Sequence, residues 1–306
     1  MPDKQVIVTG AFGFFGRHVA KIFSQNGFYV IGLGHGTWLR NEWQNWGLSE
    51  WHSCDITINN LSIYAQQPDV FIHCAGSASV GYSMAYPMQD YEKTVTTALS
   101  VLEFLRLCSP KTAFIYPSSA AVYGIAEQLP ISESVPLNPI SPYGVNKRIV
   151  EEICQSYAKH FSIPIAIARF FSMYGPFLRK QLLWDACRKI ADNDLTFYGT
   201  GKEIRDWIHV TDAARLLLVL SAHASKRVPI VNGGSGIGTP VYEIINRIIT
   251  AMDKPVSPLF SHQPKAGDPP GYIADIRRHS KYGWKPEVPL ETGIDEYVQW
   301  FQAGAS

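Results

Sequence analysis

Cysteine, net charge and long apolar runs are all scarce in this chain of 306 residues. The five cysteines are widely spaced and include no Cys-x-x-Cys pair, which argues against a disulfide framework and against a thiolate metal site. The 27 basic and 26 acidic side chains almost cancel, so no basic surface is expected for nucleic acid or for an anionic membrane. We therefore expect reduced, mostly buried thiols and no metal.

The chain also lacks the apolar segments that direct proteins to membranes. No apolar run approaches the roughly 18 residues of a membrane-spanning helix. The N-terminal residues lead at once into an apolar strand, which leaves no room for a signal peptide. These absences predict a cytoplasmic protein with no membrane partner.

What the chain does contain is a regular alternation of apolar strands and amphipathic helices. Strands are predicted at 5–8, 28–33, 69–73, 111–116 and 164–168, and long helices at 95–107 and 143–157. This alternation predicts an α/β fold with a Rossmann-type doubly wound parallel sheet. Aromatics, prolines and glycines become frequent beyond about residue 172, which indicates a smaller α+β lobe. The first domain is predicted at 1–171 with 209–232 returning to it, and the substrate lobe at 172–208 and 233–306.

A glycine-rich segment follows the first predicted strand and opens a helix. Gly10 would permit a tight turn, Gly13 would let backbone N–H groups approach a pyrophosphate, and Gly16 would let the helix pack against the strand. The alternative is a glycine turn with no ligand, but the order strand, turn, helix, strand favours a dinucleotide. Cofactor contacts are expected from Gly10, Phe12, Gly13, Phe14, Phe15 and Gly16.

Tyr143 and Lys147 are four residues apart on a predicted helix, so they share one face of it. An ammonium group beside a phenol favours the ionised phenol, whose pKa is about 10 when free. Downstream of Ser118 and Ser119, this pair indicates a proton-transfer device. The alternative for the pair alone is a solvated helix face, because the spacing is common.

Taken in order, these motifs resemble the extended short-chain dehydrogenases/reductases of the nucleotide-sugar epimerase, dehydratase and reductase group. The resemblance covers nearly the whole chain. The matching segments are TGAFGFFG at 9–16, DI at 55–56, HCAG at 73–76, SSAAVYG at 118–124, SPYGVNK at 141–147, RFFSMYGP at 169–176, GTG at 199–201, RDWIHVTD at 205–212 and GWKP at 283–286.

The resemblance implies a role for each catalytic residue. Ser119 corresponds to the serine that hydrogen-bonds the reacting sugar oxygen, and Ser118 is its more buried neighbour. Tyr143 corresponds to the acid/base, and Lys147 to the residue that holds the nicotinamide ribose and lowers the tyrosine pKa. Further cofactor contacts are implied for Asp55 and Ile56 at the adenine ring, and for Cys74, Ala75 and Gly76.

The resemblance also implies a nucleotide-sugar substrate. Arg205 matches the arginine that clamps its phosphates, Lys265 stands where a second arginine is usual, and Asp268 matches an acidic residue near the nucleotide ribose. A structural Arg205–Asp206 surface pair and a solvated loop at Lys265 and Asp268 are the alternatives. Other substrate contacts are expected at Ser79, Val80, Ser119, Arg179 and Lys180.

Departures from the family pattern restrict the chemistry. Dehydratases of the group carry Asp and Glu where this chain has Ala120 and Ala121, so 4,6-dehydration is excluded. Members that epimerise C3 and C5 use a cysteine where Ala121 stands and a histidine further on, where this chain has 177–179 without one. We do not expect epimerisation through an enol.

The end of the second predicted strand indicates the cofactor. NAD-binding members carry an acidic residue there for the adenosine 2′-hydroxyl, whereas this chain has Gly34. Glycine leaves space for a 2′-phosphate, and His35 or Arg40 could supply positive charge, so NADPH is favoured over NAD. The alternative is that His35 caps a flexible loop and NAD still binds.

These features predict an NADPH-dependent reductase of the C4 keto group of a nucleotide-linked, 6-deoxy hexose, in activated-sugar biosynthesis for surface polysaccharide. The alternatives are an NAD-dependent nucleotide-sugar 4-epimerase and, in a different class, a catalytically silent NADP-binding regulatory protein. The helices at 95–107 and 143–157 match the pair that forms a dimer interface in this family, so a homodimer is expected. The alternative for their apolar positions is core packing.

Overall fold

The computed structural model describes residues 4–263 and 271–304, and the chain divides into two compact units. The first unit comprises Met1–Gly124, Glu133–Phe170 and Ala214–Val231, and the second comprises Ile125–Ser132, Phe171–Ala213 and Asn232–Ser306. The division differs from the predicted one in two places. The return to the first unit begins at Ala214, and a short segment at Ile125–Ser132 belongs to the second unit.

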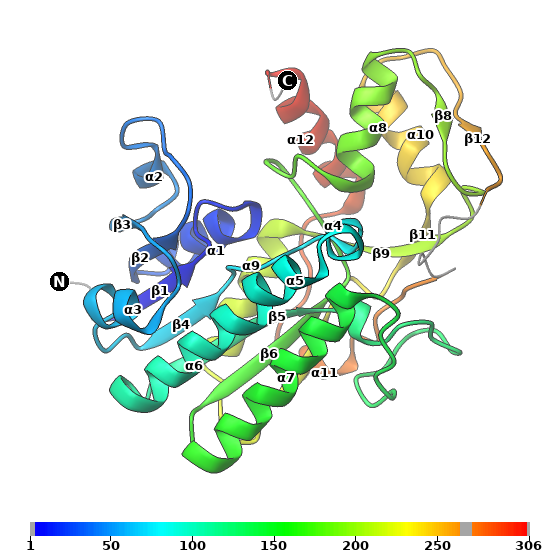
Figure 1. Ribbon diagram of the computed structural model, residues 1–306. Helices are drawn as coiled ribbons and strands as arrows, with labels where there is room; N and C mark the ends of the chain where they lie inside the picture. Colours follow the sequence, from blue (N-terminus) through cyan, green and yellow to red (C-terminus); the bar gives the residue numbers. More distant parts are fainter. Residues whose placement is uncertain (1–3, 264–270, 305–306) are drawn as a thin grey trace. The chain divides into compact units, whose positions relative to one another are not determined.

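The first unit is built on a seven-stranded sheet with the order β10-β6-β5-β4-β1-β2-β3 (Figure 1). All pairs from β6 across to β3 are parallel. The predicted doubly wound sheet is thus confirmed, and the strand order reverses between β1 and β4. The strands are β1 (Gln5–Thr9), β2 (Tyr29–Gly34), β3 (Glu50–Ser53), β4 (Val70–His73), β5 (Ala113–Ser119), β6 (Ile165–Phe170) and β10 (Ile230–Gly233).

Helices connect these strands. Figure 1 shows α6 and α7 side by side across one face of the sheet, and α1 packs against β1 and β2. A π-helical turn, Glu92–Thr96, leads into α6. The helical segments are α1 (Phe14–Gln25), α2 (Glu42–Asn45), α3 (Ile58–Tyr64), α4 (Val80–Ala85), α5 (Pro87–Tyr91), α6 (Thr97–Cys108), the 3-10 turn Ala120–Val122, α7 (Pro142–Phe161) and α9 (Val210–Ser221), whose last residues lie in this unit.

The core under α3, α6 and α7 follows the two-residue period of the strands. Alternate strand residues enter it, and the helices contribute their apolar stripes, such as Val101, Leu102 and Leu105. The strand residues of this core are Ile7, Ile31, Leu33, Phe71, Phe114, Tyr116, Ile165 and Ile167. Their burial fixes which ends of the strands project together at the edge of the sheet.

Within its described residues, the second unit holds two small sheets, four complete helices and the first turn of α9. A three-stranded sheet has the order β11-β9-β7, in which β7 and β9 are parallel and β9 and β11 antiparallel, and a two-stranded sheet pairs β12 with β8. The elements are β7 (Ser172–Tyr174), β8 (Thr196–Phe197), β9 (Ile204–His209), β11 (Gly238–Pro240), β12 (Leu259–Phe260), α8 (Gln181–Ala191), α10 (Val241–Ala251), α11 (Arg277–Ser280) and α12 (Leu290–Gln302).

Close packing of α1 on β1 predicts that Gly16 cannot be enlarged. A Cβ at Gly16 would collide with the carbonyl of Gly10 and with Ala11, so Gly16→Ala should lower the free energy of unfolding by about 1–3 kcal/mol. A thermal melt measures the change. Gly81→Ala is the matched control, because its Cβ would meet nothing closer than Ser79 Oγ at 3.9 Å. Equal melting temperatures for the two variants would contradict this account.

Candidate active site

The turn after β1 meets the segment after β4 at the point where the strand order reverses. Gly10 has φ +68°, and a Cβ there would lie 2.8 Å from the amide nitrogen of Ala75. Thr9 fixes the approach from the other side, since its hydroxyl accepts a hydrogen bond from the Ala75 N–H at 3.2 Å. Cys74 N–H donates to Thr9 O at 3.2 Å. In open α/β sheets this crevice is where ligands bind.

The N-terminus of α1 faces the same crevice end of β1. Gly13 stands at the N-cap in extended conformation, and its N–H donates to Gly10 O at 2.9 Å. The first amides of a helix have no partner within it and carry partial positive charge, which suits a pyrophosphate. Phe14 and Phe15 form the first turn of the helix. Phe12 instead packs edge-on against Trp38, with ring centroids 4.8 Å apart.

The end of β2 differs from the simple prediction of open space at Gly34. His35 Nε2 lies 2.8 Å from Asp55 Oδ1, and both side chains are 74 % exposed. The carboxylate of Asp55 therefore lies beside this strand end, within hydrogen-bonding distance of the His35 ring. Arg40 is exposed and has φ +53°. Gly34 itself has φ +140°, so replacing it by aspartate would strain the backbone as well as add a charge.

Strand β5 delivers two serines to opposite sides. Ser119 is half-buried and accepts a hydrogen bond from Ala121 N–H at 3.2 Å, which caps the 3-10 turn. Ser118 is buried, and its hydroxyl donates to Glu151 Oε1 at 2.5 Å. Successive strand residues alternate faces, so burial of Ser118 aims Ser119 outward.

Helix α7 begins where its sequence requires. Ser141 caps it by accepting the Gly144 N–H at 3.2 Å, and Pro142 occupies the first turn, where its missing N–H costs nothing. The backbone N–H of Tyr143 donates to Ser83 Oγ at 3.0 Å, which ties α7 to α4. One turn on, Lys147 Nζ donates to Pro117 O at 3.0 Å and lies 5.9 Å from the centroid of the Tyr143 ring.

Burial dominates the electrostatics of this pair. It raises the pKa of Tyr143, against a hydrogen bond with the Ser119 side chain that lowers it, and the Asp90 carboxylate raises it further. Burial also lowers the pKa of Lys147 to about 8, opposed by Cys74, Asp90 and Glu151. The low tyrosine pKa expected from Lys147 is therefore not what these residues produce. The desolvation of the phenolate outweighs the attraction that the spacing suggested.

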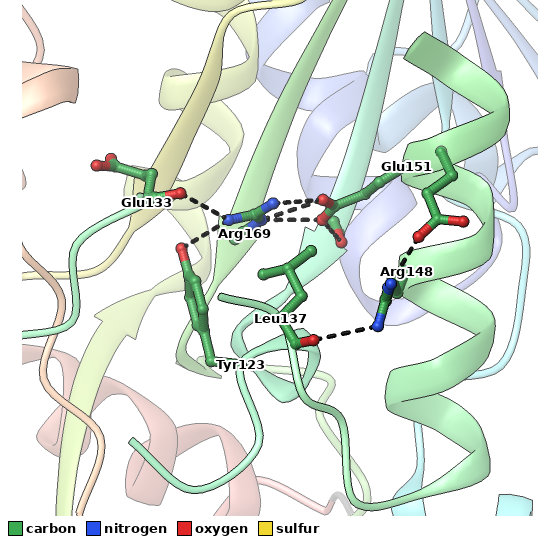
Figure 2. Close-up of polar contacts among 8 residues, drawn as sticks. Tyr123, Glu133, Leu137, Arg148, Glu151 and Arg169 are labelled. Carbon is green, nitrogen blue, oxygen red and sulfur yellow. Dashed lines mark hydrogen bonds and ion pairs between the residues drawn. The ribbon is translucent and has the colours of Figure 1, made fainter. Parts of the chain in front are cut away.

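A buried ion pair lies behind the serines (Figure 2). Arg169 Nη2 and Glu151 Oε2 are 2.6 Å apart, with side chains 4 % and 1 % exposed. Arg169 Nη1 also donates to Tyr123 OH at 3.1 Å and to Glu133 O at 3.3 Å. The sequence gives little sign of this pair, because Arg169 opens the motif at 169–176 whereas Glu151 lies outside the matching segments, and 18 residues separate the two.

Predicted substrate residues lie in both units. In the first, Ser79 caps α4 by accepting the Tyr82 N–H at 3.2 Å, and Val80 is 39 % exposed. In the second, Arg179 lies 5.9 Å from the ring centroids of both Trp184 and Trp300. Lys180 stands at the N-cap of α8. Lys265 and Asp268 lie outside the described residues.

Arg205 and Asp206 follow each other on β9 and have different environments. Asp206 is fully buried and accepts hydrogen bonds from the N–H and hydroxyl of Ser235 and from the N–H groups of Gly236 and Ala274, at 2.6–2.9 Å. The half-buried Arg205 donates to Ile204 O at 2.8 Å. Asp206 thus anchors the strand internally, which the predicted alternative of a surface pair did not foresee.

Within the part of the chain that the structure describes, no helix is long and apolar enough to cross a membrane. The same residues contain no group of three or more His, Cys, Asp or Glu side chains that could hold a metal ion.

Comparison with known proteins identifies the family. The sequence model of the NAD dependent epimerase/dehydratase family matches residues 6–234, and the chain belongs to this family. A putative UDP-glucose 4-epimerase of Methanocaldococcus jannaschii is 29 % identical over 306 residues, which cover 97 % of this chain and 98 % of that protein. The resemblance inferred from the motifs is confirmed.

Two solved structures are similar over nearly the whole chain. The UDP-glucose 4-epimerase of Thermotoga maritima has a TM-score of 0.89 at 24 % identity and covers 99 % of this chain and 100 % of its own. A mutant UDP-glucuronic acid 4-epimerase from Bacillus cereus, in complex with UDP-4-deoxy-4-fluoro-glucuronic acid and NAD, has a TM-score of 0.85 at 25 % identity and covers 98 % and 99 %. The likeness to the Thermotoga maritima enzyme, at 24 % identity, shows the fold alone.

The buried ion pair predicts a large effect from removing its cation. Arg169→Met leaves Glu151 buried and unpaired, which should lower the free energy of unfolding by about 3–5 kcal/mol. Urea unfolding of the two proteins measures the difference. Arg148→Met is the control, because it breaks the exposed Arg148–Glu152 pair on α7, the helix that carries Glu151. This change should lower the free energy of unfolding by under about 1 kcal/mol. A similar small loss in both variants would show that Glu151 tolerates isolation.

Proposed function

We propose that the protein is an NAD-dependent 4-epimerase of a nucleotide-linked sugar. One observation carries the proposal. Tyr143 lies in the first turn of α7 and is hydrogen-bonded to Ser119, and Lys147 follows one turn later on the same face of the helix. The names of the relatives, UDP-glucose and UDP-glucuronic acid 4-epimerases, support epimerisation over the 4-ketoreduction that the sequence favoured. A nucleotide-sugar substrate fits a cytoplasmic enzyme of activated-sugar biosynthesis.

The residues suit a reaction in which oxidation at C4 is followed by reduction at the same carbon. A bound NAD would supply the hydride acceptor and donor for C4 of the sugar. Tyr143 accepts the proton of the C4 hydroxyl during oxidation and gives it back during reduction, while Ser119 hydrogen-bonds the same oxygen. The proton that leaves is the proton that returns, so no net proton uptake is needed. Because burial raises the pKa of Tyr143, the phenolate that accepts this proton needs a cation beside it, which Lys147 supplies.

The crevice residues fit a dinucleotide. Gly10 and Gly13 leave the backbone free to approach a pyrophosphate, and the segment 74–76 lines the reversal point. Lys147 would hold the nicotinamide ribose. The exposed carboxylate of Asp55 beside the end of β2 can accept a hydrogen bond from a ribose hydroxyl and would repel a 2′-phosphate, which supports NAD over NADP.

One observation favours a second candidate, an NADPH-dependent 4-ketoreductase. Gly34 provides no carboxylate at the usual position, the next residue, His35, is exposed, and Arg40 is exposed further along the same loop. A ketoreductase consumes one proton and one reduced cofactor in each turnover, whereas an epimerase consumes neither. The two candidates therefore differ in their need for added cofactor.

The test is turnover without added cofactor. We expect the purified protein to retain NAD and to interconvert C4-epimeric UDP-hexoses or UDP-uronates, with sugars separated by chromatography. Tyr143→Phe should reduce turnover by on the order of 10²-fold or more while NAD remains bound. Tyr157→Phe is the control, because Tyr157 lies on the same helix and bonds Glu103. Stoichiometric oxidation of NADPH by a 4-keto sugar, with no epimerisation, would instead establish the ketoreductase.

A homodimer through α6 and α7 is part of the proposal. These helices expose apolar side chains, among them Leu99 (41 %) and Val145 (40 %). Leu99→Arg should shift the protein toward monomer in light scattering at micromolar concentration, because a two-fold interface places the new charge on both sides. Leu39→Arg, at an 80 % exposed loop residue, should leave the mass unchanged. A monomeric unmodified protein would refute the dimer.

A further inference from the structure

Asp90 is a buried carboxylate that the proposed reaction does not use. It lies on α5, has no exposed surface, and accepts a hydrogen bond from Asn146 Nδ2 at 2.7 Å through Oδ2. Its other oxygen, Oδ1, has no hydrogen-bond partner among the residues that the structure describes. Leaving a carboxylate oxygen buried without a partner is costly, so the group requires an explanation.

The partner of Asp90 leads directly to the candidate catalytic pair. Asn146 precedes Lys147 and stands three residues after Tyr143, on the first turns of α7, and α5 packs against α7. The negative charge of Asp90 raises the pKa of both Tyr143 and Lys147. The carboxylate is therefore electrostatically coupled to both groups.

A second carboxylate near Lys147 is already neutralised. Glu151, one turn further along α7, is paired with Arg169 and accepts the Ser118 hydroxyl. Among the residues that the structure describes, Asp90 forms no ion pair. Both carboxylates raise the pKa of Lys147, but Asp90 does so more strongly and, unlike Glu151, has no guanidinium paired with it.

Other titratable groups lie on neighbouring elements. The imidazole is the last residue of β4 and the thiol follows it, and a buried phenol on β5 has its ring centroid 4.8 Å from Lys147 Nζ. One acidic and one basic side chain are exposed on the π-helical turn, which packs against α7. These groups are Cys74, His73, Tyr116, Glu92 and Lys93. Burial lowers the pKa of His73 to about 3 and raises that of Cys74 to about 12, so both are neutral near pH 7.

We propose that Asp90 is a positioning residue that keeps Lys147 in its charged form and, through Asn146, fixes the first turns of α7, so that the proton moves at Tyr143 alone. The catalytic part of this role for Asp90 rests on the proposed function. Lys147 must stay cationic to favour the phenolate each time Tyr143 gives up its proton. With burial drawing the pKa of Lys147 down to about 8, loss of Asp90 would move the loss of that charge toward neutral pH.

The experiment titrates Lys147 directly, without substrate and without reference to activity. Lysine labelled with ¹³C at Cε is incorporated into the full chain, and the Lys147 signal is assigned by its disappearance in Lys147→Arg. We expect Asp90→Asn to move this titration to lower pH. Glu92→Gln, which removes an exposed charge from the adjoining turn, should leave it in place, because solvent screens that charge. An unchanged Lys147 titration in Asp90→Asn overturns the proposal.

A charge exchange separates electrostatics from packing. The double variant Asp90→Asn with Asn146→Asp keeps the carboxylate–amide hydrogen bond and returns a negative charge beside Lys147. Its Lys147 titration should lie at or above the original pH, and a titration as low as in Asp90→Asn overturns the proposal. The exchange also decides the matter if Asp90→Asn alone does not fold. Failure of 4-epimerase activity in the unmodified protein would refute the proposed function and leave the titration result standing.

In an active enzyme the same change has a kinetic signature. The alkaline limb of the pH profile of kcat/KM should move to lower pH in Asp90→Asn and return in the exchanged variant. A uniform loss of rate with unchanged limbs would indicate a structural role for Asp90 and overturn the proposal.

Discussion

The buried pair of Arg169 and Glu151 is the constraint on which the candidate site depends. Taking two charges out of water is costly, and only good geometry with further hydrogen bonds compensates for it. Here the geometry joins β6, which carries the arginine, to α7, which carries the glutamate, and Ser118 adds the end of β5. Because either charge alone would be strongly destabilising, these three elements are held in one register. Ser119 and Tyr143 take their positions from that register.

Two buried carboxylates on and against α7 illustrate how environment assigns roles to like groups. Glu151 has a guanidinium and a hydroxyl as partners, so its charge is used within the fold. Asp90 has one amide partner, and its charge extends to Lys147 and Tyr143. Burial lowers the pKa of Lys147 to about 8, against the nearby groups that raise it. A nearby carboxylate that is not neutralised by arginine restores the cation that the tyrosine requires.

The sequence predicts the interior of the fold better than its edges. Continuous apolar runs revealed β1, β2, β4, β5 and β6, because these strands are buried on both faces. Strand β3 (Glu50–Ser53) escaped prediction, since it is half-exposed at the sheet edge and carries no apolar run. The glycine turn and the Tyr143–Lys147 spacing are local and were visible. The contacts Asp90–Asn146 and Glu151–Arg169 join residues 56 and 18 positions apart, and only the folded chain brings them together.

The end of β2 carries two signals for the cofactor that point in opposite directions. Gly34 removes the carboxylate from the end of β2, which by position alone favours NADPH. In the parallel register Gly34 lies opposite Ser53 on β3, and Cys54 N–H donates to Gly34 O at 3.0 Å, so the chain after β3 runs beside this strand end. That segment brings Asp55 to within 2.8 Å of His35. The Asp55 carboxylate, in the segment after β3, can accept a hydrogen bond from a ribose hydroxyl just as a carboxylate on β2 would. A 2′-phosphate would therefore meet the charges that lie near the end of β2 in the folded chain, whichever strand they follow in the sequence.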